Sequence, residues 1–138
     1  MKVAFDTNVL LDLILNRPGR EDALKLMSAV AEEKVTGIVS ANSITDIYYI
    51  TRKGIGNNKA REAITDILSM FDIARIDGDM CSIALDLPIE DYEDALLAIC
   101  AALGGADYIA TRDQDFLESH SPVPTRTPAD LIAMIQKE

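Results

Sequence analysis

The sequence predicts an α/β fold in which a mostly parallel sheet carries helices on both faces. A short apolar run from Lys2 ends at Asp6-Thr7-Asn8, and the helical pattern of Val9–Leu15 follows at once. Strand-like runs then alternate with one or two helical runs along the chain, which is typical of crossover connections between parallel strands. Polar residues follow the strands at their carboxyl ends, where ligands bind in open α/β sheets.

Length and composition predict a single domain spanning residues 1–138. The chain has 138 residues, of which 49% are apolar, and it contains no internal repeat or low-complexity tract. Its longest apolar stretch, Ala95–Leu103, is too short to cross a bilayer, and no signal-type segment precedes Asp6. We therefore expect a soluble, cytoplasmic protein with no membrane partner.

Breaking residues divide the first half of the chain into elements. Asn16-Arg17-Pro18-Gly19 interrupts the helical pattern, and β-branched residues at 35–40 predict a second strand. We expect Ser43 to cap the next helix and Gly54 to end it. The helices expected in this half are 9–15, 20–33, 43–53 and one from Asn57 or Asn58 to Met70.

The second half repeats this alternation with strands at 72–76 and 107–111. A helix beginning at Asp77 or Gly78 is broken by Pro88. Residues 91–103 form the most hydrophobic helix, apolar on all sides after its first turn, so we expect it to pack centrally on the sheet. The chain then continues through a helical turn at Phe116 and Leu117, a loop with Pro122 and Pro124, and a closing helix that Thr127 caps before Pro128.

Cysteine and histidine usage argues against several kinds of site. Cys81 and Cys100 have no C-x-x-C spacing and no nearby histidine cluster, so neither zinc binding nor a redox motif is indicated. We expect both to be buried thiols. His120 is the only histidine and lies in a Ser-Pro-rich loop, where we expect it to be exposed. A Ser-His or Cys-His catalytic pair is therefore not indicated.

Four aspartates are expected to meet at one edge of the sheet. Asp6 and Asp113 follow strand ends, while Asp46 and Asp94 lie in the first turns of the helices that come next. Two carboxylates about 5 Å apart repel by roughly 3 kcal/mol at an effective dielectric near 20, so such a cluster favours protonation or bound cations. Oxygen ligands without His or Cys select Mg²⁺ or Mn²⁺, and one or two such ions are typical of phosphodiester hydrolysis.

Each acid also has a purely structural interpretation. Ser43-x-x-Asp46 has the spacing of a capping box, and Asp91-x-x-Asp94 has the same spacing. Asp6 with Asn8 could form an Asx-type cap. These interpretations explain single residues, but they do not explain why polar groups follow strand after strand.

Three motifs resemble those of the PIN-domain family, in particular the VapC-type toxins of bacterial toxin–antitoxin pairs. They are FDTNVL at 5–10, DYEDA at 91–95 and IATRDQDF at 109–116, and the resemblance spans nearly the whole chain. It implies a three-layer α/β/α sandwich with a mostly parallel five-stranded sheet. It also implies a Mg²⁺- or Mn²⁺-dependent endoribonuclease.

The resemblance assigns roles to individual residues. Asp6, Asp46, Asp94 and Asp113 match the family's acidic quartet, although the family usually has a Glu where this chain has Asp46. The metal ligands implied are Asp6, Asp94 and Asp113, with Asp115 as an auxiliary ligand. Thr7, Asn8 and Thr111 match polar positions that orient water or a carboxylate. The partners implied are an RNA substrate, a small antitoxin and a second copy of the chain in a homodimer.

A basic stretch is the candidate RNA contact. The formal charge of −10 argues against a polyanionic partner, yet residues 47–61 contain no acid. Arg52, Lys53, Lys59 and Arg61 all lie there and could hold the RNA backbone. Arg52 and Lys53 could equally serve the negative end of the helix dipole before Gly54.

Two other functions stay open at this stage. One is a non-catalytic PIN-fold binding or adaptor protein, which the Asp at position 46 leaves possible. The other is an aspartate phosphotransfer domain, which also places an Asp at a strand end. A dehalogenase-type domain needs a second Asp two residues after the first, where this chain has Asn8, and a receiver needs a late Lys, where the nearest cation is Arg112.

Overall fold

The computed structural model describes residues 1–138 as a five-stranded sheet with helices on both faces. All neighbouring strands are parallel, in the order β3-β2-β1-β4-β5. This arrangement confirms the predicted α/β/α sandwich. The strands are β1 (Lys2–Phe5), β2 (Thr36–Ser40), β3 (Asp72–Ala74), β4 (Tyr108–Ala110) and β5 (Thr125–Arg126).

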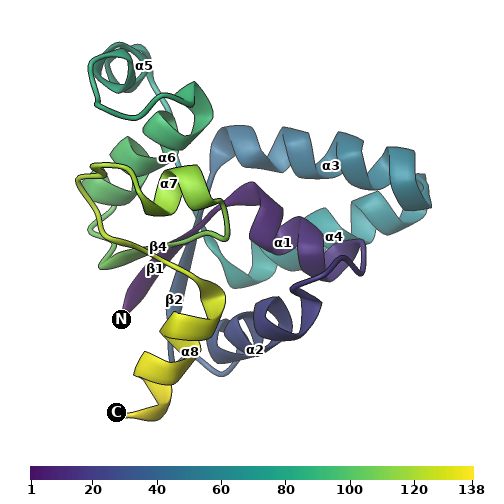
Figure 1. Ribbon diagram of the computed structural model, residues 1–138. Helices are drawn as coiled ribbons and strands as arrows, with labels where there is room; N and C mark the ends of the chain where they lie inside the picture. Colours follow the sequence, from purple (N-terminus) through teal and green to yellow (C-terminus); the bar gives the residue numbers. More distant parts are fainter.

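Eight helices connect and cover these strands (Figure 1). Side chains of α1 to α4 and of α8 pack on one face, whereas those of α5 and α6, with Phe116 of α7, pack on the other. No helix is both long enough and apolar enough to cross a membrane. The helices are α1 (Thr7–Ile14), α2 (Arg20–Ala31), α3 (Ala41–Ile55), α4 (Asn57–Met70), α5 (Gly78–Leu85), α6 (Tyr92–Leu103), α7 (Gln114–Leu117) and α8 (Pro128–Gln136).

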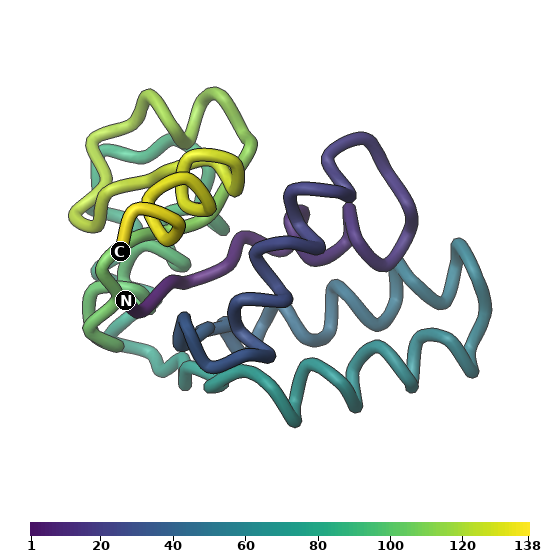
Figure 2. The backbone as a smooth tube through the Cα atoms, turned by 90° about the horizontal axis from the view of Figure 1, so that it is seen from below, coloured from purple at the N-terminus to yellow at the C-terminus, as the bar shows by residue number.

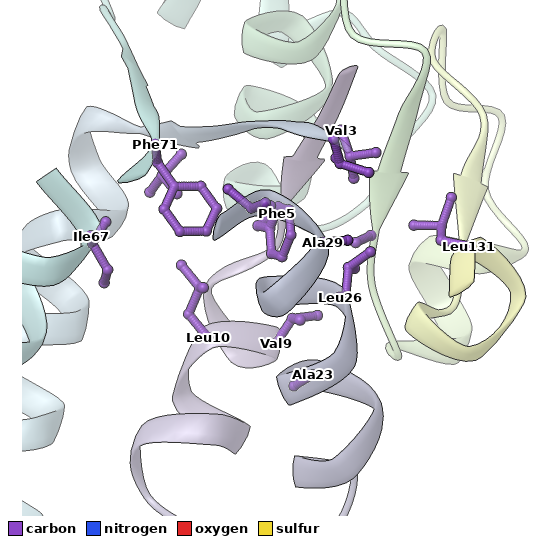
Figure 3. Packing of buried hydrophobic residues seen from close by; sticks show 14 of the residues in the cluster. Val3, Phe5, Val9, Leu10, Ala23, Leu26, Ala29, Ile67, Phe71 and Leu131 are labelled. Atoms are coloured by element: carbon purple, nitrogen blue, oxygen red, sulfur yellow. The ribbon is translucent and has the colours of Figure 1, made fainter. Parts of the chain in front are cut away.

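Strand β1 is the centre of the sheet, and its side chains alternate between the two cores. Val3 and Phe5 enter the cluster beneath α1, α2 and α8, and Ala4 enters the cluster beneath α6. Phe5 meets Phe71 edge to face, with ring centroids 5.0 Å apart (Figure 3). Packing on both faces therefore fixes the backbone immediately before Asp6.

Helix α6 lies against the sheet as its hydrophobicity predicts. Every residue from Ala95 to Ala101 is buried. Asp91 caps the helix, because its Oδ1 accepts a hydrogen bond from the Asp94 amide at 3.0 Å. Cys100 is buried within this helix as expected, whereas Cys81 is only partly buried. The burial of α6 anchors the Asp94 end of the helix against the strands.

Helices α3 and α4 form a long hairpin that projects from the sheet (Figure 2). The prediction that Ser43 caps α3 is wrong, since the helix begins at Ala41 and Ser43 is buried inside its first turn. The prediction that Gly54 ends α3 is also wrong. The helix continues to Ile55 and stops at Gly56, whose φ of 97° is accessible to glycine at little cost.

The segment between α7 and α8 contains a strand that the element-by-element prediction assigned to a loop. Residues Thr125 and Arg126 pair with Ile109 and Ala110 as β5. Thr127 caps α8 by accepting from the Asp130 amide at 3.1 Å, and Pro128 follows, as predicted. His120 is exposed in the loop, also as predicted.

Candidate active site

Asp6 leaves the carboxyl end of β1 and is only 9% exposed. Its Oδ2 accepts a hydrogen bond from the Thr111 hydroxyl at 2.8 Å. Asp6 occupies the N-cap position of α1 without a side-chain capping bond of standard geometry, although the amides of Asn8 and Thr7 lie close enough to its carboxyl to lower the pKa. Burial raises the pKa of the Asp6 carboxyl and the charge of Asp113 adds to the rise, although the Thr111 hydrogen bond opposes it. A bound cation would offset the unfavourable burial of the ionised Asp6 carboxylate.

Thr111 links the exit of β4 to the exit of β1. It is fully buried, and while its hydroxyl donates to Asp6 it accepts from the Asp113 amide at 3.1 Å. Asp113 in turn caps the short helix α7 by accepting from the amides of Asp115 and Phe116. Thr111 thus fixes the positions of Asp6 and Asp113 relative to each other.

Two adjacent acids of α6 face the same region. Burial, with the charges of Asp6, Asp91 and Asp113, raises the pKa of Asp94 to about 7. A hydrogen bond with Asp46, together with partial burial, raises the pKa of Glu93 to about 7. The charge of Asp46 adds to the rise, because repulsion between the two carboxylates favours the protonated form of Glu93.

These acids line one pocket of about 150 Å³ at the carboxyl edge of the sheet. The predicted residues that line it include Thr7 and Asn8 as well as the four aspartates. Asp115 lies outside it, in an adjoining groove that shares Asp94 and Asp113 as a wall. The carboxylates around the pocket are Asp6, Asp46, Asp91, Glu93, Asp94 and Asp113.

A chain of hydroxyl groups forms another part of the pocket wall. The Thr7 hydroxyl donates to Ser43 at 2.8 Å, and Ser43 and Ser40 share a further hydrogen bond of 2.8 Å. Thr7 therefore contacts a serine and not an acid. Asn8 accepts from Arg17 at 3.4 Å. The hydroxyl chain fixes the start of α3, and with it Asp46, against the start of α1.

The donors in the pocket fit a hard divalent cation. All of them are oxygens, which Mg²⁺ and Mn²⁺ prefer over nitrogen or sulfur. In addition, the Oδ1 of Asn42 is buried at this pocket without a hydrogen-bond partner. No three His, Cys, Asp or Glu side chains are spaced closely enough to hold one ion as they lie. An ion bound here would therefore use one or two of the carboxylates directly and complete its coordination with water.

The basic residues predicted to contact RNA lie along the α3–α4 hairpin, and none of them lines the pocket. Lys59 forms an exposed ion pair with Glu62 at 3.4 Å. Asp46 and Ile50 are both on the pocket wall, and Lys53 follows on that same helix face, two turns and roughly 10 Å from Asp46. Arg52 is turned away from that face. Lys53 is thus the member of the set directed toward the site.

A comparison with known families decides what kind of domain carries this pocket. Residues 2–115 match the family model described as the PIN domain. The chain belongs to the PIN-domain family. The matched segment contains all the acids of the pocket, and it confirms the resemblance that the sequence motifs indicate. No curated protein matches the PIN domain described here at a significant level.

Solved structures of VapC-type PIN domains share this fold. VapBC2 from Rickettsia felis, solved with a promoter DNA fragment, has a TM-score of 0.70 at 17% identity, over 92% of this chain and 98% of that one. VapC20 from Mycobacterium tuberculosis, a toxin that cleaves the sarcin-ricin loop, has a TM-score of 0.68 at 14% identity, over 83% and 92%. A toxin–antitoxin complex from Klebsiella pneumoniae has a TM-score of 0.65 at 25% identity, over 91% and 97%.

The PIN-domain pocket contains residues that the sequence interpretation missed. Glu93 was passed over because only Asp94 precedes the small residue of the motif, yet both lie in the first turn of α6. Ser40 and Ser43 were missed as pocket residues because β2 was expected to end in a simple helix cap. A second carboxylate next to a motif acid at a helix start is the signal that could have identified Glu93.

We expect the ion-free protein to lose stability as the pH rises from about 5 to about 8. The folded-state pKa values of Glu93 and Asp94, about 7, lie above the values of about 4 for unfolded chains. Between pH values of about 4 and about 7 the folded state therefore binds more protons than the unfolded state. The stability that these two groups contribute is fully present below about pH 4 and is lost as the pH rises through about 7. Melting temperatures measured in EDTA across this range test the prediction.

The control for this titration is the double variant Glu93→Gln and Asp94→Asn. Its amides cannot ionise, so its melting temperature should vary less between the two pH values than that of the unaltered protein. Added Mg²⁺ should raise the melting temperature of the unaltered protein at about pH 8. A melting temperature that climbs steadily from acid to neutral pH in the unaltered protein contradicts the shifted carboxyl groups.

Proposed function

We propose that this chain is a divalent-metal-dependent endoribonuclease and the toxin of a toxin–antitoxin pair. The observation that carries the proposal is the convergence of carboxylates from β1, α3, α6 and the β4 exit on one pocket. The VapC-type fold supports the toxin assignment. We take residues 1–138 to act as one PIN domain.

In this proposal Asp6, Asp94 and Asp113 hold Mg²⁺ or Mn²⁺, with Asp115 as an auxiliary ligand beside Asp113. Asp46 completes the catalytic set, with Glu93 as its hydrogen-bonded neighbour on the pocket wall. Thr111 keeps the Asp6 carboxylate oriented. Bound here, one or two such ions supply a nucleophilic water at neutral pH and stabilise negative charge on the leaving oxygen.

The chain's own groups perform the remaining tasks. Crowding of carboxylates raises the pKa values of Glu93 and Asp94 to about 7 in the ion-free protein, and a bound cation would lower both and favour the ionised groups. Asn8, exposed on the pocket wall, is available to orient water or a phosphate oxygen. Thr111, which is fully buried, excludes water from the side of the Asp6 carboxylate that it contacts.

The partners proposed are RNA as substrate, a small antitoxin, and a second copy of the chain in a homodimer, all in the cytoplasm. Support for the antitoxin comes from the similarity to toxin–antitoxin complexes. Tyr49 and Ile50 on α3, which are 58% and 40% exposed, are candidate apolar contacts for such partners.

The test is incubation of the purified protein with labelled RNAs and Mn²⁺ or Mg²⁺, with the cut ends mapped. Internal cuts that disappear in EDTA and in the Asp6→Asn variant support the nuclease. RNA that is bound but stays intact in every metal favours the adaptor alternative. Phosphorylation of Asp6 by a phosphodonor favours the phosphotransfer alternative. Intact RNA under all conditions overturns the proposal.

We expect Lys53→Ala to weaken RNA binding more than Arg52→Ala does. Lys53 lies on the Asp46 face of α3, whereas Arg52 is turned away and can serve the helix terminus. Losing one phosphate contact should reduce affinity by roughly threefold to tenfold and flatten the salt dependence. Titration of labelled RNA at several salt concentrations measures both. Equal effects of the two variants contradict the assignment of Lys53 to the pocket face.

A further inference from the structure

The side chain of Asp12 is a buried carboxylate outside the acidic pocket. It lies in the second turn of α1, and its side chain is 2% exposed. Both of its oxygens are occupied by one guanidinium: Arg112 Nε binds Oδ2, and Arg112 Nη2 binds Oδ1 at 2.9 Å. Gly19 makes room for the pair, because a Cβ there would lie 3.2 Å from Asp12 Oδ2. Asp12 and Arg112 thus form an ion pair that packs closely against Gly19.

An ion pair with a buried carboxylate contributes little net stability, because the cost of desolvating Asp12 offsets its attraction to Arg112. Its effect is to fix the position of one charged group. Arg112 stands between Thr111 and Asp113, in the turn that carries two site residues. Asp6 and Asp113 are close enough for their charges to act on the guanidinium.

Only one edge of the Arg112 guanidinium is used by Asp12. Two of its five N–H groups donate to that carboxylate, which leaves the Nη1 edge without a partner. The Arg112 side chain is 48% exposed, and its chain neighbour Asp113 lines the acidic pocket, so unpaired N–H groups of Arg112 are accessible near that pocket. A planar, fixed set of donors matches the oxygens of a phosphate group.

We propose that Arg112, held in place by Asp12, is a phosphate-binding residue that docks the RNA backbone at the edge of the carboxylate pocket. This inference rests on the proposed function for its substrate class. The Arg17 side chain, which donates to Asn8 on the pocket wall, provides a second cation on the same side. Because the pocket itself repels phosphates, a fixed cation at its edge is what an acidic nuclease needs to position the strand.

The test measures binding of a labelled oligouridylate at low salt in EDTA, where no cleavage occurs, and the salt dependence of its Kd. Arg112→Ala should weaken binding about tenfold and reduce the slope of log Kd against log salt by about 0.7. Arg112→Lys should keep the slope and lose part of the affinity, because it retains the charge without the fork. Lys34→Ala, at the amino end of β2, is the charge-matched control.

The double variant Asp12→Asn with Arg112→Ala separates binding from structure. Arg112→Ala alone leaves a buried unpaired carboxylate and should lower the melting temperature, and Asp12→Asn should restore most of that loss. RNA affinity should not recover in the double variant. If affinity recovers together with the melting temperature, or if Arg112→Ala leaves Kd and slope unchanged, Arg112 has only a structural role and the inference is overturned.

The outcome for the unaltered protein separates this inference from the proposed function. Binding without cleavage in Mg²⁺ or Mn²⁺ contradicts the proposed nuclease activity but is compatible with Arg112 as a phosphate contact. Cleavage that is unaffected by Arg112→Ala contradicts the role of Arg112 but is compatible with the nuclease activity. Failure of the unaltered protein to bind the oligouridylate at low salt overturns the inference about Arg112.

Discussion

Replacing Asp6 by Asn should reduce RNA cleavage by at least about 100-fold while leaving the protein folded. Asp6 is the most buried acid of the pocket, and the change removes its charge without altering its shape. A two-decade loss corresponds to about 2.7 kcal/mol of transition-state stabilisation, within the range that charge stabilisation by a metal site supplies. Initial rates on a mapped RNA substrate, in excess Mn²⁺, measure it.

The stability of Asp6→Asn separates loss of chemistry from loss of fold. Burial already raises the pKa of Asp6, so a neutral amide suits this position and the melting temperature in EDTA should stay equal or rise. The Asn side chain still offers an oxygen to the Thr111 hydroxyl. The rise in melting temperature on adding Mn²⁺ should shrink. Cleavage at the original rate, with the metal response intact, would refute the role of Asp6.

The candidate site follows from the sequence to a large extent because parallel strands end at one edge. Asp6 and Asp113 could be placed at strand exits from local pattern alone, and the order of elements brought Asp46 and Asp94 beside them. That step needs no knowledge of side-chain packing. It therefore succeeded for residues far apart in sequence, and it predicted the sandwich as well.

What the sequence could not reveal depends on helix phase and on short-range geometry. Strand β5 has only two residues and follows Pro124, so no periodicity identifies it. Gly54 lies inside α3 because the turn that stops the helix is the positive φ of Gly56. Asp12 resembles an ordinary polar position of an amphipathic helix until Arg112 is folded against it.

The charge of the chain gives these local features a common consequence. With a net charge of −10, long-range electrostatics oppose the approach of RNA. If RNA is the substrate, as we propose, its binding would depend on short-range cations such as Arg112 and Lys53 and on divalent ions that neutralise the pocket. Raising the salt concentration should weaken both the attraction at the pocket and the global repulsion, so RNA affinity should respond less steeply than for a basic nuclease.

Gly37→Ala should destabilise the protein by about 2–3 kcal/mol, the largest effect expected of a single added methyl group here. Gly37 pairs with Val3 in the register of β2 and β1. A Cβ at this position would lie 2.5 Å from two ring atoms of Phe71, closer than packed atoms approach. Phe71 is itself 5% exposed and packed edge to face on Phe5 (Figure 3), so its ring has little room to move. Urea denaturation measures the loss.

The matched control is Gly78→Ala, since Gly78 opens α5 with no atom within 4 Å of its added Cβ and no positive φ. Its stability should change by less than about 1 kcal/mol. Combining Gly37→Ala with Phe71→Leu should cost less than the sum of the two single changes, because the smaller side chain vacates the space that the methyl group needs. Strictly additive losses would mean that the ring of Phe71 does not limit β2, and that the backbone before Asp6 is held by other contacts.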